Sequence, residues 1–155
     1  MQIGGLVTEL GLNQCAYGMV KSFNELAAGN EYQVTAYWQR LANPASEPCF
    51  ATMNLSELNT FKGIGIATTL ELADTLLKNN SAVIPFYYIF DIEWLKTVVS
   101  FDYAMGIMRD PHLSLIARSK SHQAIIENYC NKPVAGIVED WDLDQLLPLL
   151  QESIC

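Results

Sequence analysis

The sequence predicts an α/β fold: a single Rossmann-like domain with three layers, in which helices cover both faces of a doubly wound, mainly parallel six-stranded sheet. Short apolar runs alternate with segments of helical period along the chain, which is the pattern of successive βαβ units. The most apolar run, AVIPFYYIF, is continuously hydrophobic and carries no charge, as expected of a strand covered on both faces. The chain has 155 residues, enough for about one domain.

Each predicted strand is a short apolar run followed by turn or capping residues. The runs are Ile3 to Val7, Tyr32 to Trp38, Gly63 to Ala67, Ala82 to Phe90, Leu113 to Ala117 and Val134 to Val138. Pro85 argues against a central position for the fourth run because proline cannot donate to the ladder, but the run is too apolar for an edge. Phe50 to Met53 is expected to be a brief extended piece outside these six. The expected strand order is 3-2-1-4-5-6.

The predicted helices lie between the strands and begin at residues that cap helix N-termini. They span Ala16 to Ala28, Leu70 to Lys78, Tyr103 to Met108, a stretch ending near Tyr129, and a last segment after Asp142 or Asp144. Thr68 or Thr69 is expected to cap the second helix, and Ser119 or Ser121 the fourth. Pro148 is expected to interrupt the last helix because it lacks an N–H.

The charge balance disfavours several classes of partner. The chain has 17 acidic and 9 basic residues and a net charge of −8, so it lacks the positive field that attracts nucleic acid or anionic lipid. Its apolar runs are shorter than a membrane span, and its N-terminus lacks the basic and apolar regions of a secretory signal. We therefore expect a cytoplasmic protein with no nucleic-acid or membrane partner.

The four cysteines do not have the spacing of a metal site. Cys15, Cys49, Cys130 and Cys155 are far apart in the sequence, and no C-x-x-C or H-x-x-H pair occurs. We expect reduced thiols, no metal and no cofactor. Cys15 lies near the start of a helix, where a thiolate would be stabilised, but a buried apolar role is the favoured interpretation.

Familiar nucleotide-binding and hydrolase motifs are missing from the sequence. Gly4, Gly5 and Gly11 do not form the G-x-G-x-x-G pattern, and no G-x-x-x-x-G-K-[ST] occurs. Without such glycines the backbone cannot readily approach a pyrophosphate. The G-x-S-x-G turn of α/β-hydrolases is also missing.

Successive βαβ units that lie side by side are expected to bring the turns after residues 90 and 117 to one shared edge of the sheet. Open parallel sheets bind ligands at the carboxyl ends of their strands, which directs attention to the loops that follow them. One candidate group lies between the fifth strand and its helix. Arg118, Ser119, Lys120, Ser121 and His122 combine cations, hydroxyls and free N–H groups, which suit a phosphate or carboxylate. The alternative is that a serine only caps the helix and the charges are solvated.

A second candidate group follows the most apolar strand. Asp91 and Glu93 point the same way if that strand continues, and two nearby carboxylates can divide into a base and a stabiliser. Trp94 offers an aromatic face on which a sugar ring can stack. The alternative is a turn residue at Asp91 and a core position for Trp94.

Two segments carry a resemblance to a known family. They are IPFYYIFDIEW and LSLIARSKSHQAIIENYCNKPVAGIVEDWDL, and the second contains the series strand, ARS-x-SH, helix, N-x-P-V, strand. In this layout the chain resembles the N-terminal half of GT-B-fold glycosyltransferases. It is also similar to phage sugar transferases, which share an aromatic strand ending in Asp, and this implies a viral or metagenomic origin.

The resemblance implies a function for the two candidate groups. In GT-B enzymes the N-terminal domain receives the acceptor and the C-terminal domain holds most of the nucleotide-sugar donor. We therefore expect a glycosyltransferase-like acceptor half that binds a sugar or nucleotide-sugar. Asp91 would act as acceptor base with Glu93 in reserve, and Trp94 would stack on the sugar. The anion-facing residues would be Arg118, Ser119, Ser121 and His122.

The chain departs from that family in its length. A complete transferase has a second domain of similar size, so catalysis by this chain alone is not expected, and its partner would be a separately encoded donor domain. A non-catalytic interaction protein on the same scaffold is the alternative. It predicts an exposed apolar patch and association into a homo-oligomer. A receiver-like phosphotransfer module is disfavoured because no acidic pair follows the first strand.

Overall fold

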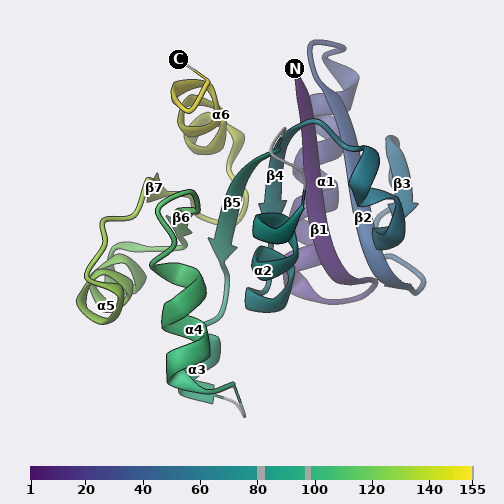
Figure 1. The fold of residues 1–155 in the computed structure, drawn as a ribbon. Coiled ribbons are helices and arrows are strands. Elements are labelled where there is room, and N and C mark those ends of the chain that lie inside the picture. Colours follow the sequence, from purple (N-terminus) through teal and green to yellow (C-terminus); the bar gives the residue numbers. More distant parts are fainter. Residues whose placement is uncertain (80–82, 97–98, 155) are drawn as a thin grey trace.

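The structure is a computed structural model that describes residues 1–79, 83–96 and 99–154, and its strands form one parallel sheet. The strands are β1 (Gln2–Leu10), β2 (Gln33–Leu41), β3 (Ala51–Asn54), β4 (Gly63–Ala67), β5 (Val83–Ile89), β6 (Ser114–Ala117) and β7 (Gly136–Ile137). They lie in the order β3-β2-β1-β4-β5-β6-β7, and every neighbouring pair is parallel (Figure 1). The α/β, Rossmann-like prediction is therefore confirmed.

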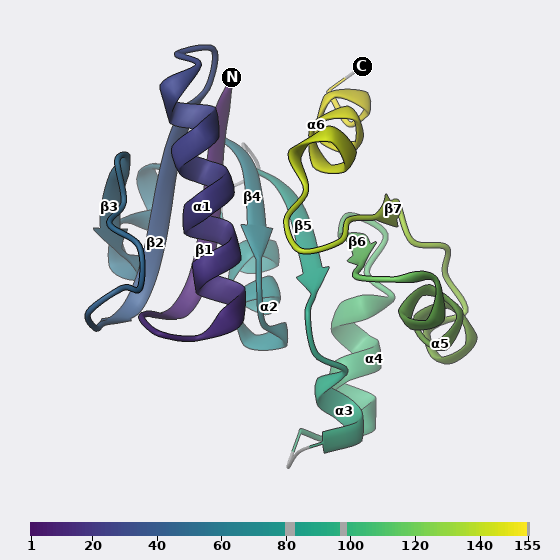
Figure 2. The same cartoon turned by 180° about the vertical axis from the view of Figure 1, so that it is seen from behind.

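Helices cover both faces of the sheet, which gives the three layers. They are α1 (Gln14–Ala28), α2 (Leu70–Lys78), α3 (Glu93–Lys96), α4 (Phe101–Met108), α5 (Lys120–Cys130) and α6 (Leu143–Glu152), with a 3-10 helix, η1, over Leu55–Thr60. α2, α4 and α5 share one hydrophobic core with one face of the sheet, and α1 and α6 share another with the opposite face. Figure 1 shows α2 and α4 in front of the sheet, and Figure 2 shows α1 in front.

The predicted strand count and one strand position are wrong. The sheet has seven strands, because Ala51–Asn54 forms the edge strand β3 beside β2. Gly63–Ala67, third among the predicted strands, lies in the centre beside β1 and not beyond β2. The physical reason is burial. Every residue of β3 is exposed, so this segment lacks the apolar run typical of a buried strand. Four of the five residues of β4 are buried, which fits a position inside the sheet and not at its edge.

Two prolines sit inside regular elements. Pro85 lies in the central strand β5, opposite Gly65 of β4, and β6 begins only opposite Phe86. Because Pro85 lies before the start of β6, its missing N–H breaks no bond to that strand. The predicted interruption at Pro148 is wrong, since α6 continues through it with Leu146 and Leu150 fully buried. Ala82, placed in the fourth strand from the sequence, lies outside the described residues.

Side-chain caps fix where the helices start. Thr69, not Thr68, caps α2, Ser119, not Ser121, caps α5, and Asp142, not Asp144, caps α6. Asn13 caps α1 by accepting a hydrogen bond from the N–H of Ala16 at 2.8 Å. Several of these caps follow a strand directly, so the N-terminal ends of α1, α2 and α5 lie near the carboxyl ends of β1, β4 and β6.

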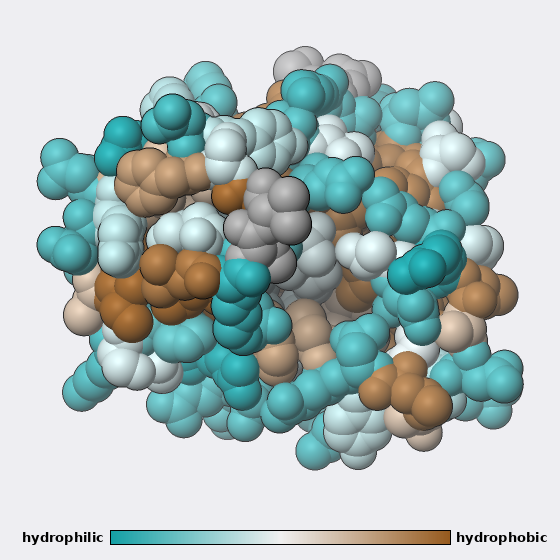
Figure 3. Space-filling view, turned by 90° about the horizontal axis from the view of Figure 1, so that it is seen from below, coloured by the Kyte–Doolittle hydropathy of each residue, from teal (hydrophilic) through white to brown (hydrophobic). Residues whose placement is uncertain are grey.

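Parallel pairing brings the strand ends to one edge of the molecule. Ile89 at the end of β5 is the register partner of Ala117 at the end of β6, so the turns after residues 90 and 117 share this edge, as predicted. Figure 3 looks onto it from below and shows mostly hydrophilic side chains interrupted by separate hydrophobic areas. In the described ranges, no helix combines the length and apolarity needed to cross a membrane.

Candidate functional site

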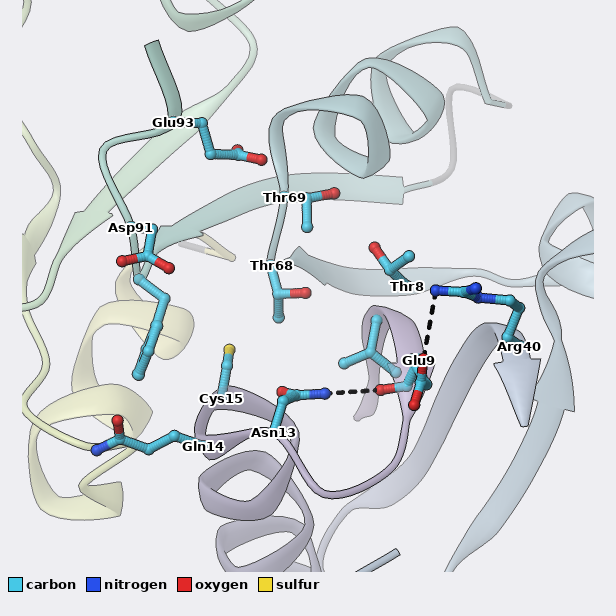
Figure 4. Close-up of a pocket in the computed structure, with 12 residues that line it drawn as sticks. Thr8, Glu9, Asn13, Gln14, Cys15, Arg40, Thr68, Thr69, Asp91 and Glu93 are labelled. Carbon is cyan, nitrogen blue, oxygen red and sulfur yellow. Dashed lines mark hydrogen bonds and ion pairs between the residues drawn. The ribbon is translucent and has the colours of Figure 1, made fainter. Parts of the chain in front are cut away.

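A cleft of about 500 Å³ lies at the carboxyl ends of β1, β4 and β5 (Figure 4). Its lining residues are Val7, Thr8, Glu9, Asn13, Gln14, Cys15, Arg40, Thr68, Thr69, Phe90, Asp91 and Glu93. From β1 the chain crosses to β2 on one side, and from β4 it crosses to β5 on the other, so the cleft lies at the point where the strand order reverses. This is the position at which open α/β sheets bind ligands.

The wall formed by β1 and β2 carries an ion pair. Arg40 Nη2 lies 3.3 Å from Glu9 Oε2, and the two residues are register partners on the neighbouring strands. The sequence pattern does not reveal either as a site residue, because the apolar runs of their strands end at Val7 and Trp38. The structure extends these strands to Leu10 and Leu41, which brings Glu9 and Arg40 to the rim.

The opposite wall carries hydroxyls and a carboxylate. Thr68 Oγ1 donates a hydrogen bond to the carbonyl of Leu6 at 2.8 Å, which fixes the turn after β4 against β1. Asp91 lies just after β5, and its Oδ1 is 2.7 Å from Lys96 Nζ. The Asp91 side chain remains 55% exposed, so its carboxylate is accessible to a ligand.

Glu93 lines the same cleft but is held by hydrogen bonds. The Tyr87 hydroxyl donates to Glu93 Oε2 at 2.6 Å, and the N–H of Leu70 donates to the same oxygen at 2.7 Å. The condition under which Asp91 and Glu93 would point the same way, a continuing strand, is not met, because β5 ends at Ile89 and Glu93 begins α3. The pKa of the Tyr87 phenol is raised well above its usual value, chiefly by burial and to a lesser extent by the negative charge of Glu93.

Trp94 lies in the core and outside the cleft lining. Its side chain is only 8% exposed, and its ring packs edge-on against Tyr129 with the centroids 6.1 Å apart. Little of the indole is therefore left for a sugar to stack on. Trp94 therefore occupies a core position, which is the alternative given for it in the sequence analysis. The aromatic side chain that lines the cleft is Phe90.

The Arg118 group lies beside the cleft and not in its lining. The Arg118 guanidinium stacks 4.0 Å from the centre of the Phe90 ring, and its Nη1 donates to the Phe90 carbonyl at 3.4 Å. Ser119 accepts from the N–H of His122 at 3.2 Å, and its Oγ lies 2.9 Å from that of Ser121. Phe90 is thus the direct link between Arg118 and the cleft. Nδ1 of His122 is buried and has no hydrogen-bond partner among the described residues.

The chemistry available at the cleft is polar and does not involve a reactive thiol. Cys15 is only partly buried and lines the cleft, but desolvation raises the pKa of its thiol to about 12, so the thiol stays protonated at neutral pH. Cys49 and Cys130 are also free thiols, and Cys155 lies outside the described residues. In the part of the chain that the structure describes, no three His, Cys, Asp or Glu side chains gather as a metal site.

Comparisons with profiles of protein families, with curated proteins and with solved structures found no match for this chain. The function must therefore be argued from the geometry and chemistry of the cleft.

Proposed function

We propose that the chain is the acceptor-side part of a glycosyltransferase-like protein. The cleft binds a sugar, and glycosyl transfer requires a partner domain that holds a nucleotide-sugar donor. The observation that carries this proposal is the cleft at the reversal of strand order, where Asp91 shares one cavity with the hydroxyls of Thr8, Thr68 and Thr69.

The lining of the cleft suits a polyhydroxylated ligand. Sugar hydroxyls both donate and accept hydrogen bonds, and threonine hydroxyls do the same, whereas an ionised carboxylate accepts only. Phe90 supplies an apolar surface beside these polar groups. The volume of about 500 Å³ lies within the range of roughly 300–1,000 Å³ that is usual for small-molecule sites.

Asp91 is the proposed base. Its carboxylate takes the proton of the attacking sugar hydroxyl while that oxygen forms the new glycosidic bond and the nucleotide leaves with the electron pair of the bond that breaks. In the free protein Asp91 is paired with Lys96, and both side chains are more than half exposed. Exposed pairs contribute at most about 1 kcal/mol, so a ligand can replace Lys96 at small cost.

The Arg118 group is proposed to face the anionic donor. Arg118 lies against Phe90, and Ser119 and Ser121 stand at the N-terminal end of α5, where free N–H groups favour an anion. His122 belongs to the same turn. These residues support donor binding from beside the cleft, while Asp91 acts inside it.

Calorimetric titration tests the proposal. Wild-type protein is titrated with UDP-, GDP- and ADP-sugars and with free glucose, galactose and mannose, and at least one of them is expected to give heat and a thermal shift. Asp91→Asn is expected to weaken binding of a free sugar about tenfold. Asp102→Asn makes the same change at an exposed residue of α4 that is not part of the cleft lining, and is expected to bind like wild type. No heat from any ligand would refute the proposal.

A non-catalytic interaction protein is the second candidate, and exposed leucines at the carboxyl edge favour it. Three well-exposed leucines lie there: Leu12 follows β1, Leu41 ends β2, and Leu95 lies in α3, which follows β5. Burial of these side chains would drive self-association. Light scattering at increasing protein concentration separates the two candidates: a concentration-dependent rise in mass together with no sugar binding supports the interaction protein.

A further inference from the structure

Glu93 joins three elements around the cleft. It is the first residue of α3, and its Oε2 accepts hydrogen bonds from the Tyr87 hydroxyl of β5 and from the N–H of Leu70, the first residue of α2. The carboxylate thereby ties the segment after β5 to the segment after β4.

Both donors suit a negatively charged acceptor. The N–H of Leu70 belongs to the N-terminal end of α2, where the helix dipole favours a carboxylate. The Tyr87 side chain is fully buried, so an unpaired hydroxyl there would carry the cost of a lost hydrogen bond. A hydrogen bond from a neutral hydroxyl to a charged oxygen is also stronger than one between neutral groups. These contacts hold Glu93 in one position.

Asp91 lies between two fixed points. Ile89, two residues before it, is the last residue of β5 and pairs with Ala117. Glu93, two residues after it, is bound to Tyr87 and Leu70. The location of the Asp91 carboxylate relative to Thr68 and Thr69 therefore depends on the Glu93 contacts.

We propose that Glu93 is a positioning residue that holds Asp91 in the cleft, and that it is not a second base. This inference rests on the proposed sugar-binding function of the cleft. It makes a specific prediction about the glutamine variant. Both donors meet the same oxygen, so in Glu93→Gln the carbonyl oxygen of the introduced side-chain amide accepts both bonds, whereas Glu93→Ala loses them.

The test measures sugar affinity by chemical-shift titration with free glucose, galactose and mannose, under conditions in which circular dichroism shows each variant fully folded. Glu93→Ala is expected to bind about tenfold more weakly than wild type, and Glu93→Gln within about twofold. In the Asp91→Asn background, Glu93→Ala is expected to cause no further loss, because a positioning residue acts through Asp91. Asp102→Asn is the matched control and is expected to bind like wild type.

Each outcome decides the question. If wild type binds sugar and Glu93→Ala binds it with the same affinity, the inference is overturned. It is also overturned if Glu93→Ala lowers sugar affinity about tenfold in the Asp91→Asn background, or if Glu93→Gln binds sugar as weakly as Glu93→Ala. If Glu93→Ala does not fold, the Tyr87→Phe variant decides, because it removes the hydroxyl that donates to Glu93 Oε2. Weaker sugar binding by this variant supports the inference, and binding equal to wild type overturns it. Absence of binding to wild type refutes the proposed function itself.

Discussion

Gly5 lets α1 lie close against β1, and replacing it with alanine is expected to destabilise the protein. A Cβ at this position would lie 2.5 Å from Met19 Sδ and 2.7 Å from Cε2 of Phe23. The methionine end can turn away, but the Phe23 ring is held edge-on by Phe50 and Trp141, with centroids 5.6 and 6.0 Å away. Relief of the overlap therefore requires a shift of α1, whose N-terminal residues line the cleft.

Overpacking of this kind costs about 1–3 kcal/mol, and we expect about 2 kcal/mol for Gly5→Ala. For a chain of this size that corresponds to a Tm lower by about 4–8 °C. Urea unfolding followed by circular dichroism measures the difference.

Gly106→Ala is the matched control. Gly106 lies inside α4, and a Cβ there would meet no atom within 4 Å. This variant is expected to be more stable than wild type by up to about 1 kcal/mol, because alanine favours a helix over glycine. A Gly5→Ala variant as stable as wild type would refute the argument that this glycine is required by the approach of α1.

Three further predictions concern ionisable and reactive groups. The raised pKa of buried Tyr87 adds stability that is complete below the usual phenol pKa of 10.0 and is lost as the pH rises above it. Urea unfolding between pH 9 and about 11 is therefore expected to show that the free energy of unfolding falls less steeply with pH for Tyr87→Phe than for wild type. The same dependence on pH in both proteins would contradict this. Iodoacetamide is expected to modify exposed Cys49 much faster than Cys15 in the native protein, because the raised pKa of Cys15 leaves little thiolate. Peptide mass spectrometry measures both rates, and equally rapid native labelling of Cys15 would contradict this. Lys132 Nζ donates to the carbonyls of Met108, Asp110 and Leu113, so Lys132→Met is expected to lower the free energy of unfolding by about 1–3 kcal/mol, and an unchanged urea midpoint would contradict this.

The sequence predicted those parts of the fold whose burial is continuous. The apolar run of β5 and the alternation of strands with helices sufficed for the α/β class and for the shared edge of the turns after residues 90 and 117. β3 could not be recognised as a sheet strand because its four residues are exposed and its pairing with β2 is a tertiary contact.

The candidate site was predicted only in part. The sequence predicts Asp91 and Glu93 directly after the apolar strand that is β5, and both residues line the cleft. The hydrogen bonds of Glu93 depend on Leu70, which lies 23 residues away, so no local pattern reveals them. Trp94 could serve either a ligand or the core, and only the packing against Tyr129 distinguishes the two. Arg40 reaches the cleft through strand register, which cannot be obtained from its own segment.

The central claim is that the cleft between β1, β4 and β5 binds a sugar. The most direct measurement is an amide chemical-shift titration of the wild-type protein with glucose, galactose and mannose. We predict that the amides of Thr8, Thr68 and Asp91 move in a saturable manner, while those of Asn131 and Lys132, at a distant surface, stay in place. Saturable shifts confined to that distant surface, or no shifts with any of the sugars, would contradict the account.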